Sequence, residues 1–198
     1  MPANYNHPKK GSSIKVEPIR KLDDIHKIKS LLKDKPRDYC LFCTGINTAF
    51  RAGEILSLKI HQVENLDVGD RLEIKQSKTK TFRAVTVNAT VVDSIQRWLA
   101  VHPRTEPNAP LFISQKGHNA LTVSTVNRMI KRWCKDTGIQ GQFGTHSMRK
   151  SWGYFQRTIN NAPVALLMSA YGHASEAQTL AYLGIQDSEI SDLYDLEL

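Results

Sequence analysis

Six residues of this chain together carry the functional groups that a metal-free phosphoryl transfer needs. Two guanidinium groups can bind the charged oxygens of a phosphodiester. Imidazole and ammonium groups can transfer protons, and a phenol hydroxyl can act as a nucleophile. Two arginines, a lysine, two histidines and a tyrosine make up the set: Arg51, Lys78, His146, Arg149, His173 and Tyr182.

Each of these residues has an ordinary alternative explanation when it is taken alone. His146 and Arg149 are three residues apart, so a helix would place them on one face, where such a pair is usually solvated. Arg51 could be a surface arginine at the start of a helix. His173 and Tyr182 could be core residues. Their order and spacing together, rather than any single residue, therefore carry the functional prediction.

The charge of the chain favours a polyanionic partner. The net charge is +8 and the isoelectric point is about 9.4. The last twelve residues hold five acidic and no basic residues, which leaves 27 basic and 14 acidic residues, or +13, on residues 1–186. A body this basic is typical of proteins that bind nucleic acid. Charge alone is equally compatible with a basic soluble protein that binds none.

The three cysteines do not predict a metal site or a disulfide scaffold. Cys40 and Cys43 form a CxxC pair, but no second pair exists and Cys134 stands alone. Structural zinc sites use four ligands, so buried helical cysteines are the better interpretation. We expect no metal and no cofactor. We also expect no membrane association, since no apolar run reaches the roughly 18 residues that a spanning helix needs.

The pattern of apolar residues predicts helices with one β-hairpin. Residues 1–18 lack periodicity and predict a flexible arm or linker. Alternating segments at 71–76 and 82–87, joined by a turn, predict the hairpin, and a short strand follows at 111–113. Asn88 and Ser124 are the predicted caps of the helices that follow them. The predicted helices are 22–35, 38–49, 52–58, 91–100, 124–138, 145–159, 164–171 and 175–183.

Four short segments present the six residues in a characteristic arrangement. In segment 50–58, Arg51 follows an aromatic residue and precedes two small residues, an acid and an apolar run. Segment 76–87 has Lys78 in the hairpin turn and a second lysine, Lys80, before an alternating strand. The third segment is the His-x-x-Arg of 146–149. The fourth joins Gly-His at 172–173 to a threonine three residues before Tyr182.

In this order and spacing the segments resemble the tyrosine recombinase (phage integrase) family over about residues 20–185. The resemblance implies an α+β, mainly α-helical catalytic-domain fold with a small antiparallel β-hairpin at one edge. Three features depart from the family pattern. Lys150 stands where the family usually has histidine or another residue that packs beneath the site, Tyr171 stands where leucine is common, and the hairpin turn lacks the usual glycine.

The resemblance further implies a site-specific recombinase or integrase that cleaves and rejoins DNA strands without metal or ATP. Tyr182 would attack a phosphodiester, forming a 3′-phosphotyrosine bond and releasing a 5′-hydroxyl. Arg51 and Arg149 would hold the two non-bridging oxygens. Glu54 would support Arg51 without reacting.

The remaining groups would move protons or bind the phosphate. Lys78 would protonate the leaving 5′-oxygen, and Lys80 is the alternative because turn registers slip. His146 would assist proton transfer at Tyr182, and His173 would donate a hydrogen bond to the phosphate. Two other functions stay open: a type IB topoisomerase-like enzyme, and a catalytically silent, sequence-specific DNA-binding regulator.

The resemblance also predicts domains and partners. The expected parts are the arm 1–18, a catalytic domain 19–186 and an acidic amphipathic tail 187–198. The expected partners are double-stranded DNA, other copies of the chain in a dimer or tetramer on DNA, and an accessory DNA-bending protein. The expected location is cytoplasmic and nucleoid-associated. The chain is expected to be either a naturally short recombinase or an isolated catalytic fragment, and the sequence is compatible with both.

Overall fold

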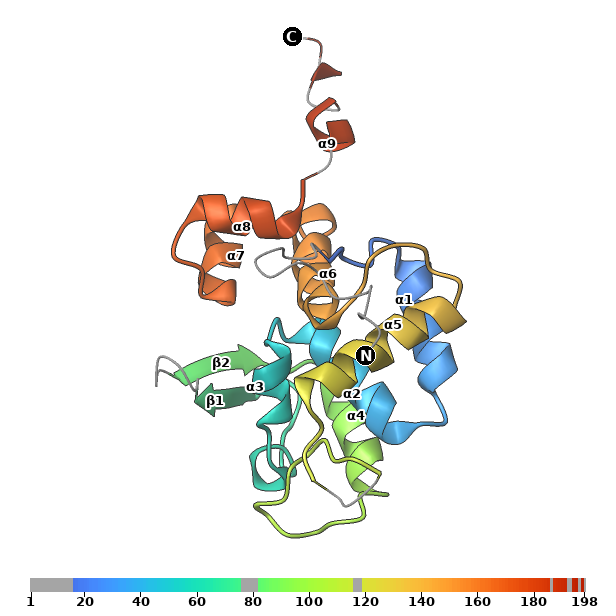
Figure 1. Ribbon diagram of the computed structural model, residues 1–198. Helices are drawn as coiled ribbons and strands as arrows, with labels where there is room; N and C mark the ends of the chain where they lie inside the picture. The colour runs from blue at the N-terminus through green and yellow to red at the C-terminus, as the bar shows by residue number, and fades with distance from the viewer. Residues whose placement is uncertain are drawn as a thin grey trace, which may run out of the picture.

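The computed structural model describes residues 16–75, 82–115, 119–185, 187–191, 194, 195 and 197. Within these residues the chain is mainly helical, with one two-stranded sheet at an edge of the body (Figure 1), as the sequence predicts. The helices are α1 Leu22–Leu32, α2 Pro36–Asn47, α3 Ala52–Leu56, the 3-10 helix η1 Ile60–Gln62, α4 Ala89–Leu99, α5 Val123–Asp136, α6 Thr145–Thr158, α7 Val164–Tyr171, α8 Glu176–Leu183 and α9 Asp187–Ser191.

Helix α2 is the centre of the main core. Its residues 40–46 are all buried, and it packs against α4 and α6. Cys40 and Cys43 are fully buried within it, which confirms their interpretation as core cysteines. Burial raises the pKa of Cys40 to about 12, so its thiol stays protonated. The described residues contain no group of three or more His, Cys, Asp or Glu side chains that could hold a metal ion.

The sheet is the predicted hairpin. Strand β1 (Arg71–Lys75) pairs antiparallel with β2 (Phe82–Thr86), and Leu72 and Ile74 are buried in the core. The predicted strand 111–113 is wrong. Among the described residues, one isolated bridge joins Lys59 to Pro110, just before this stretch, and another joins Ile113, its last residue, to Ala120. Each end therefore pairs with a different segment, and no ladder extends along it.

The two predicted helix caps have different outcomes. Asn88 caps α4 as predicted, because its side-chain oxygen accepts a hydrogen bond from the backbone N–H of Val91 at 3.1 Å. Ser124 is not the cap of α5. Thr122 accepts from the N–H of Thr125 at 3.2 Å instead, so the helix begins at Val123 and Ser124 lies within its first turn.

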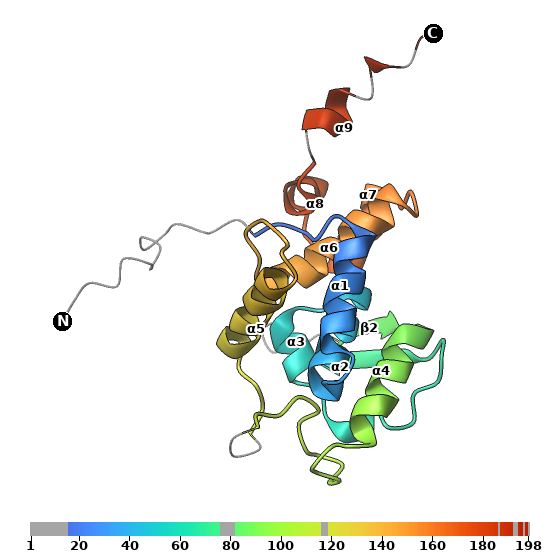
Figure 2. The same ribbon diagram turned by 90° about the vertical axis from the view of Figure 1, so that its right-hand side faces the viewer.

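Helices α7 and α8 form a smaller unit that lies against α6 (Figures 1 and 2). A second cluster of four buried apolar residues supports it: Ala49, Leu167, Tyr171 and Leu183. Beyond α8 the chain extends away from the body to α9 (Figure 2). Glu189 of α9 pairs with Arg157 at the end of α6. No described helix is long and apolar enough to cross a membrane.

Parts of the predicted arm and tail lie outside the described residues. The arm is described only from Val16, and Ile19, just beyond it, is buried with its N–H bonded to Ser151 Oγ at 2.7 Å. In the tail, the described stretch includes one short helix, α9. The predicted boundaries at 18/19 and 186/187 therefore remain predictions.

Candidate active site

The start of α3 fixes Arg51 beside a carboxylate. Arg51 is the residue before the first turn of α3, and its backbone N–H donates to Glu54 Oε2 at 2.7 Å. Its guanidinium Nη1 also pairs with Glu54 Oε1 at 3.0 Å. Burial tends to raise the pKa of Glu54, but the bond from the Arg51 backbone and the charge of Arg83 lower it overall. Glu54 is therefore ionised and orients Arg51.

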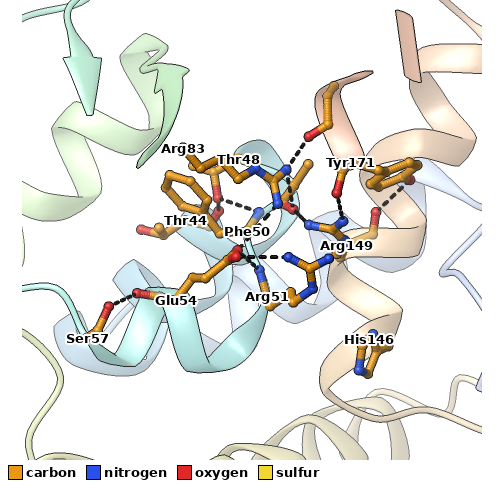
Figure 3. A network of polar contacts seen from close by, with 12 residues as sticks. Thr44, Thr48, Phe50, Arg51, Glu54, Ser57, Arg83, His146, Arg149 and Tyr171 are labelled. Carbon is orange, nitrogen blue, oxygen red and sulfur yellow. Dashed lines mark hydrogen bonds and ion pairs between the residues drawn. The ribbon is translucent and has the colours of Figure 1, made fainter. Parts of the chain in front are cut away.

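Two more guanidinium groups, those of Arg83 and Arg149, lie next to this pair (Figure 3). Both donate to the carbonyl oxygen of Ala49, Arg83 over 3.1 Å. Ala49 has φ of 54°, in the left-handed region that is uncommon for a residue with a side chain. The chain turns sharply there, and the carbonyl oxygen of this buried residue is the shared acceptor of two arginines, from β2 and α6.

Arg149 is almost completely buried, with 2% of its surface exposed. Besides Ala49, it donates from Nη2 to the carbonyl oxygen of Tyr171 at 2.5 Å. The Tyr171 hydroxyl in turn donates to the carbonyl oxygen of Arg149 at 3.1 Å. By contrast, 42% of the Arg51 side chain is exposed. The two arginines that the sequence assigns to one phosphate thus differ in access, and only Arg51 is widely open to solvent.

His146 and Tyr182 form the hydrogen bond that a tyrosine nucleophile needs. His146 lies on the same helix as Arg149, and its Nδ1 is 3.1 Å from the Tyr182 hydroxyl oxygen. Burial, followed by the charge of Arg149, lowers the pKa of His146. Its imidazole is therefore neutral at pH 7 and can accept the phenol proton. Burial raises the pKa of Tyr182, while the nearby charge of Arg149 opposes that rise.

His173 is positioned by the turn between α7 and α8. Gly172 ends α7 in the left-handed conformation with φ of 63°, which glycine adopts without strain. His173 then stacks on Tyr171, with ring centroids 4.9 Å apart, and its Nδ1 is 3.1 Å from Thr179 Oγ1. Burial and the charge of Arg149 lower its pKa to about 4. A neutral ring held through Nδ1 leaves Nε2 available to a ligand.

The structure brings five of the six predicted residues into one site. The ring centroids of Tyr182 and His173 are 5.1 Å apart. The guanidinium carbon of Arg149 lies 5.8 Å from the Tyr182 ring centroid. Arg51 is near enough to influence the pKa of His146. The sixth residue, Lys78, and its alternative Lys80 lie outside the described residues.

Sequence reasoning missed three residues of the site. In the sequence Arg83 is one residue of an alternating strand, yet in the structure it joins the arginine cluster. In the sequence Tyr171 and Lys150 are only departures from the family pattern. Tyr171 packs beneath Arg149, and the Lys150 ammonium lies 4.9 Å from the Tyr182 ring centroid. The departures themselves were the available signal, because both residues contact predicted site residues.

The charges of the site favour an anionic ligand. The site holds three guanidinium groups and the Lys150 ammonium, and the ionised Glu54 carboxylate pairs with two of them, Arg51 and Arg83. Partly buried positive charges are stabilised by a bound anion. With a neutral histidine beside a phenol, the arrangement can bind a phosphate and activate an oxygen nucleophile towards it.

Comparison with known proteins identifies the class to which this fold and site correspond. Residues 19–189 match the model of the phage integrase family. A probable integrase/recombinase, YoeC of Bacillus subtilis, is 31% identical over 182 residues, which cover 90% of this chain and 95% of that protein. The chain therefore belongs to the phage integrase family.

Other relatives are longer than this chain. The tyrosine recombinase XerC of Alcanivorax borkumensis is 24% identical over 83% of the chain, but the match covers only 52% of that protein. The crystal structure of XerA recombinase superposes with a TM-score of 0.75 at 24% identity, covering 90% of this chain and 65% of that one. The post-cleavage complex of XerH with a palindromic difH substrate gives 0.74 at 23% identity, covering 97% and 56%. These structures show that the fold is that of a recombinase catalytic domain.

Proposed function

We propose that this chain is a site-specific DNA recombinase or integrase that cleaves and rejoins strands through a 3′-phosphotyrosine intermediate. The observation that carries the proposal is the 3.1 Å hydrogen bond between His146 Nδ1 and the Tyr182 hydroxyl, next to the Arg149 guanidinium. A nucleophile, its base and a group for the developing charge lie together, which is the arrangement that covalent catalysis requires.

The chemical step proceeds by transesterification. The Tyr182 oxygen attacks phosphorus as its proton passes to neutral His146, and the bond from phosphorus to the 5′-oxygen breaks. The 5′-oxygen takes a proton from Lys78, or from Lys80 if the turn register differs. The phosphotyrosine keeps the phosphodiester bond energy, so attack by a second 5′-hydroxyl rejoins a strand without ATP.

The arginines stabilise the charge that develops on the phosphate. Arg51 approaches one non-bridging oxygen from the solvent side, and Arg149 uses the N–H groups not engaged by the backbone. His173 donates a hydrogen bond from Nε2, in the neutral tautomer whose Nδ1 accepts from the Thr179 hydroxyl. Electrostatic groups of this kind are typically worth about 3–4 kcal/mol each in rate.

Double-stranded DNA and further copies of this chain are the proposed partners. The net charge of +13 on residues 1–186 supports the first. Among the structural neighbours, XerH is bound to DNA and lambda integrase is a dimer on a core site, which supports the second. We propose an accessory DNA-bending protein as a further partner. The proposed location is cytoplasmic and nucleoid-associated, and the proposed catalytic domain spans residues 19–186.

A nicked suicide DNA substrate tests the proposal, because the strand that leaves after cleavage diffuses away and the protein stays attached. We expect the parent to form a covalent adduct and Tyr182→Phe to form none while binding DNA as the parent does. Tyr194→Phe is the matched control, since 84% of that side chain is exposed outside the site. An adduct with Tyr182→Phe would disprove the assignment of the nucleophile.

The same assay separates the two alternatives and the metal requirement. Binding without trapping indicates a DNA-binding regulator, and relaxation of any supercoiled plasmid without recombinants indicates a topoisomerase-like enzyme. We expect trapping to persist in excess EDTA, because arginines and histidines supply the charge and proton transfer. Trapping that stops in EDTA and returns with magnesium would contradict this mechanism.

A further inference from the structure

Arg83 is a buried cation in the middle of the site that the proposed chemistry leaves without a role. It lies in β2, and only 10% of its side chain is exposed. Its Nη1 pairs with Glu54 Oε2 at 3.4 Å, and its Nη2 donates to the carbonyl oxygens of Ala49 and Ala170. Its guanidinium carbon also lies 5.5 Å from the Phe50 ring centroid. One side chain thus connects the hairpin to two distant segments of the chain.

The contacts of Arg83 parallel those of Arg149. Both arginines donate to the carbonyl oxygen of Ala49 on one side. On the other side Arg83 donates to Ala170 and Arg149 donates to Tyr171, which are consecutive residues. Two guanidinium groups therefore connect the segment just before Arg51 to the segment just before His173 (Figure 3).

Arg83 also acts on Arg51 through a shared carboxylate. Glu54 binds Arg51 through Oε1 and Arg83 through Oε2. Without Arg83, one oxygen of this largely buried carboxylate loses its charged partner. A carboxylate in that position can shift to find another donor, and Arg51 shifts with it.

The position of Arg83 argues against direct contact with DNA. Its guanidinium is turned inward onto one carboxylate and two carbonyl groups. Burial and the charge of Arg149 lower its pKa to about 10, so it remains charged at neutral pH. A buried charge is costly unless its partners are well placed. Arg83 therefore serves the geometry of the groups around it.

We propose that Arg83 is a positioning residue for the phosphate-binding groups, acting on Arg51 through Glu54 and on His173 through the carbonyl of Ala170. This inference rests on the proposed function, because it concerns the same site. It assigns Arg83 to the groups that hold the phosphate, and not to the lysine that protonates the leaving oxygen.

Arg83→Lys and Arg83→Met test this role against Arg71→Met. Arg71 lies on the same hairpin, but 73% of its side chain is exposed and its carboxylate partner is Glu73. We expect the single-turnover cleavage rate at saturating protein to fall at least about tenfold in Arg83→Met and less in Arg83→Lys. We expect DNA affinity within about twofold of the parent in both Arg83 variants, and no change of the cleavage rate in Arg71→Met.

A substrate with sulfur in place of the 5′-bridging oxygen identifies the groups through which Arg83 acts. A thiolate leaves without being protonated, so this substrate removes the need for the lysine but not for the phosphate-binding groups. We expect the Arg83→Lys defect to remain on it. Disappearance of the defect would overturn the proposal, because Arg83 would then act through the lysine.

Circular dichroism at the assay temperature shows which Arg83 variants are folded. If Arg83→Met does not fold, Arg83→Lys, which retains the positive charge, is compared with the parent. A folded Arg83→Met that cleaves at the parental rate would show that Arg83 has only a structural role. Failure of the parent itself to trap DNA would count against the proposed function, and is distinguishable because it does not depend on Arg83.

Discussion

The two halves of the site rest on packing of very different extent. Arg51, Glu54 and helix α6 belong to a body whose core runs from Ile19 to Met148 and includes buried residues of α1, α2, α4 and α5. His173 and Tyr182 belong to α7, α8 and the turn between them, which are supported by a second cluster of only four buried apolar residues. The arginines proposed to bind the phosphate are thus firmly held, while Tyr182, the proposed nucleophile, stands on a lightly anchored unit.

Polar contacts replace apolar burial where the two halves meet. Arg149 donates to the carbonyl oxygens of Ala49 and Tyr171, and Tyr171 returns a hydrogen bond to the carbonyl oxygen of Arg149. Hydrogen bonds from a charged group depend strongly on geometry. Arg149, proposed to bind the phosphate, therefore also holds the segment that leads to Tyr182, and a change in one affects the other.

The difference predicts where the molecule opens first. Local stability follows the amount of buried apolar contact, so segments with little of it exchange with open states more readily. We expect α7 and α8 to exchange their amide hydrogens faster than α2 and α4. Movement of that unit would carry Tyr182 towards or away from Arg51 without disturbing the main core.

The largest effect is expected from Arg149→Met, which removes the guanidinium shared by both halves. Cleavage should fall by about 10²–10³-fold, the cost of losing one oxyanion-stabilising group. Hydrogen exchange should become faster in α7 and α8 and stay unchanged in α2 and α4. Arg157→Met is the control, because Arg157 lies on the same helix and pairs with Glu189. Equal loss of protection in both halves would contradict the comparison.

A pair of glycine substitutions compares the two clusters directly. A Cβ added at Gly153 would lie 1.7 Å from the Tyr171 hydroxyl oxygen, whereas one at Gly45 would lie 2.4 Å from Met148 Sδ. A rigid ring cannot yield as a thioether can. We expect Gly153→Ala to lower the free energy of unfolding by about 1–3 kcal/mol and to reduce cleavage with it.

Gly45→Ala should affect the main core less, because the Met148 side chain can change rotamer. Urea unfolding and trapping on the suicide substrate measure the two effects. A Gly153→Ala protein that keeps parental cleavage would show that the contact between α6 and Tyr171 does not position the nucleophile.

The sequence predicted what depends on local pattern. The helical repeat gave α1 and α2, alternation gave the hairpin, and the asparagine cap of α4 followed from side-chain chemistry. The strand predicted at 111–113 failed because three apolar residues carry no information about a partner. Ser124 failed as a cap because a second hydroxyl residue, Thr122, lies two positions earlier and accepts from the backbone N–H of Thr125.

The site was predictable in its residue types but not in its contacts. Order and spacing pointed to five residues that the structure brings together, such as His146 and Tyr182. The role of Arg83 was not predictable, because the carbonyl groups it binds belong to residues 49 and 170, far away in the sequence. The types of the side chains do not reveal which backbone carbonyl groups will accept hydrogen bonds. The burial of Arg149 was hidden for the same reason.

Lys150→Met concerns a smaller effect, confined to the nucleophile. The Lys150 ammonium lies 4.9 Å from the Tyr182 ring centroid, and only 6% of the residue is exposed. A cation at a ring face holds the ring and favours a developing phenolate. We expect cleavage to fall by roughly fivefold to tenfold, with DNA affinity unchanged because the residue is buried. A matched change of an exposed lysine, Lys131→Met, should alter affinity rather than the cleavage rate.

Acid provides the last test, because it acts on His173 in the lightly anchored unit. In the folded protein the pKa of His173 is lowered to about 4, and when α7 and α8 open it returns towards its usual value of 6.5. Above pH 6.5 the ring is neutral in both states. As pH falls from 6.5 towards 4 the open state binds a proton that the closed state does not, so opening becomes more favourable by at most about tenfold per pH unit.

We therefore expect protection factors of amides in α7 and α8 to fall between pH 6.5 and 4, with those in α2 and α4 changing less. Cleavage should fall in the same direction, since protonated His146 cannot accept the phenol proton and its pKa also lies below the usual value. His173→Gln removes the titrating ring and should flatten the pH dependence of protection. If that variant kept the full dependence, the acid sensitivity would belong to another group, and the link between His173 and the anchoring of α7 and α8 would be wrong.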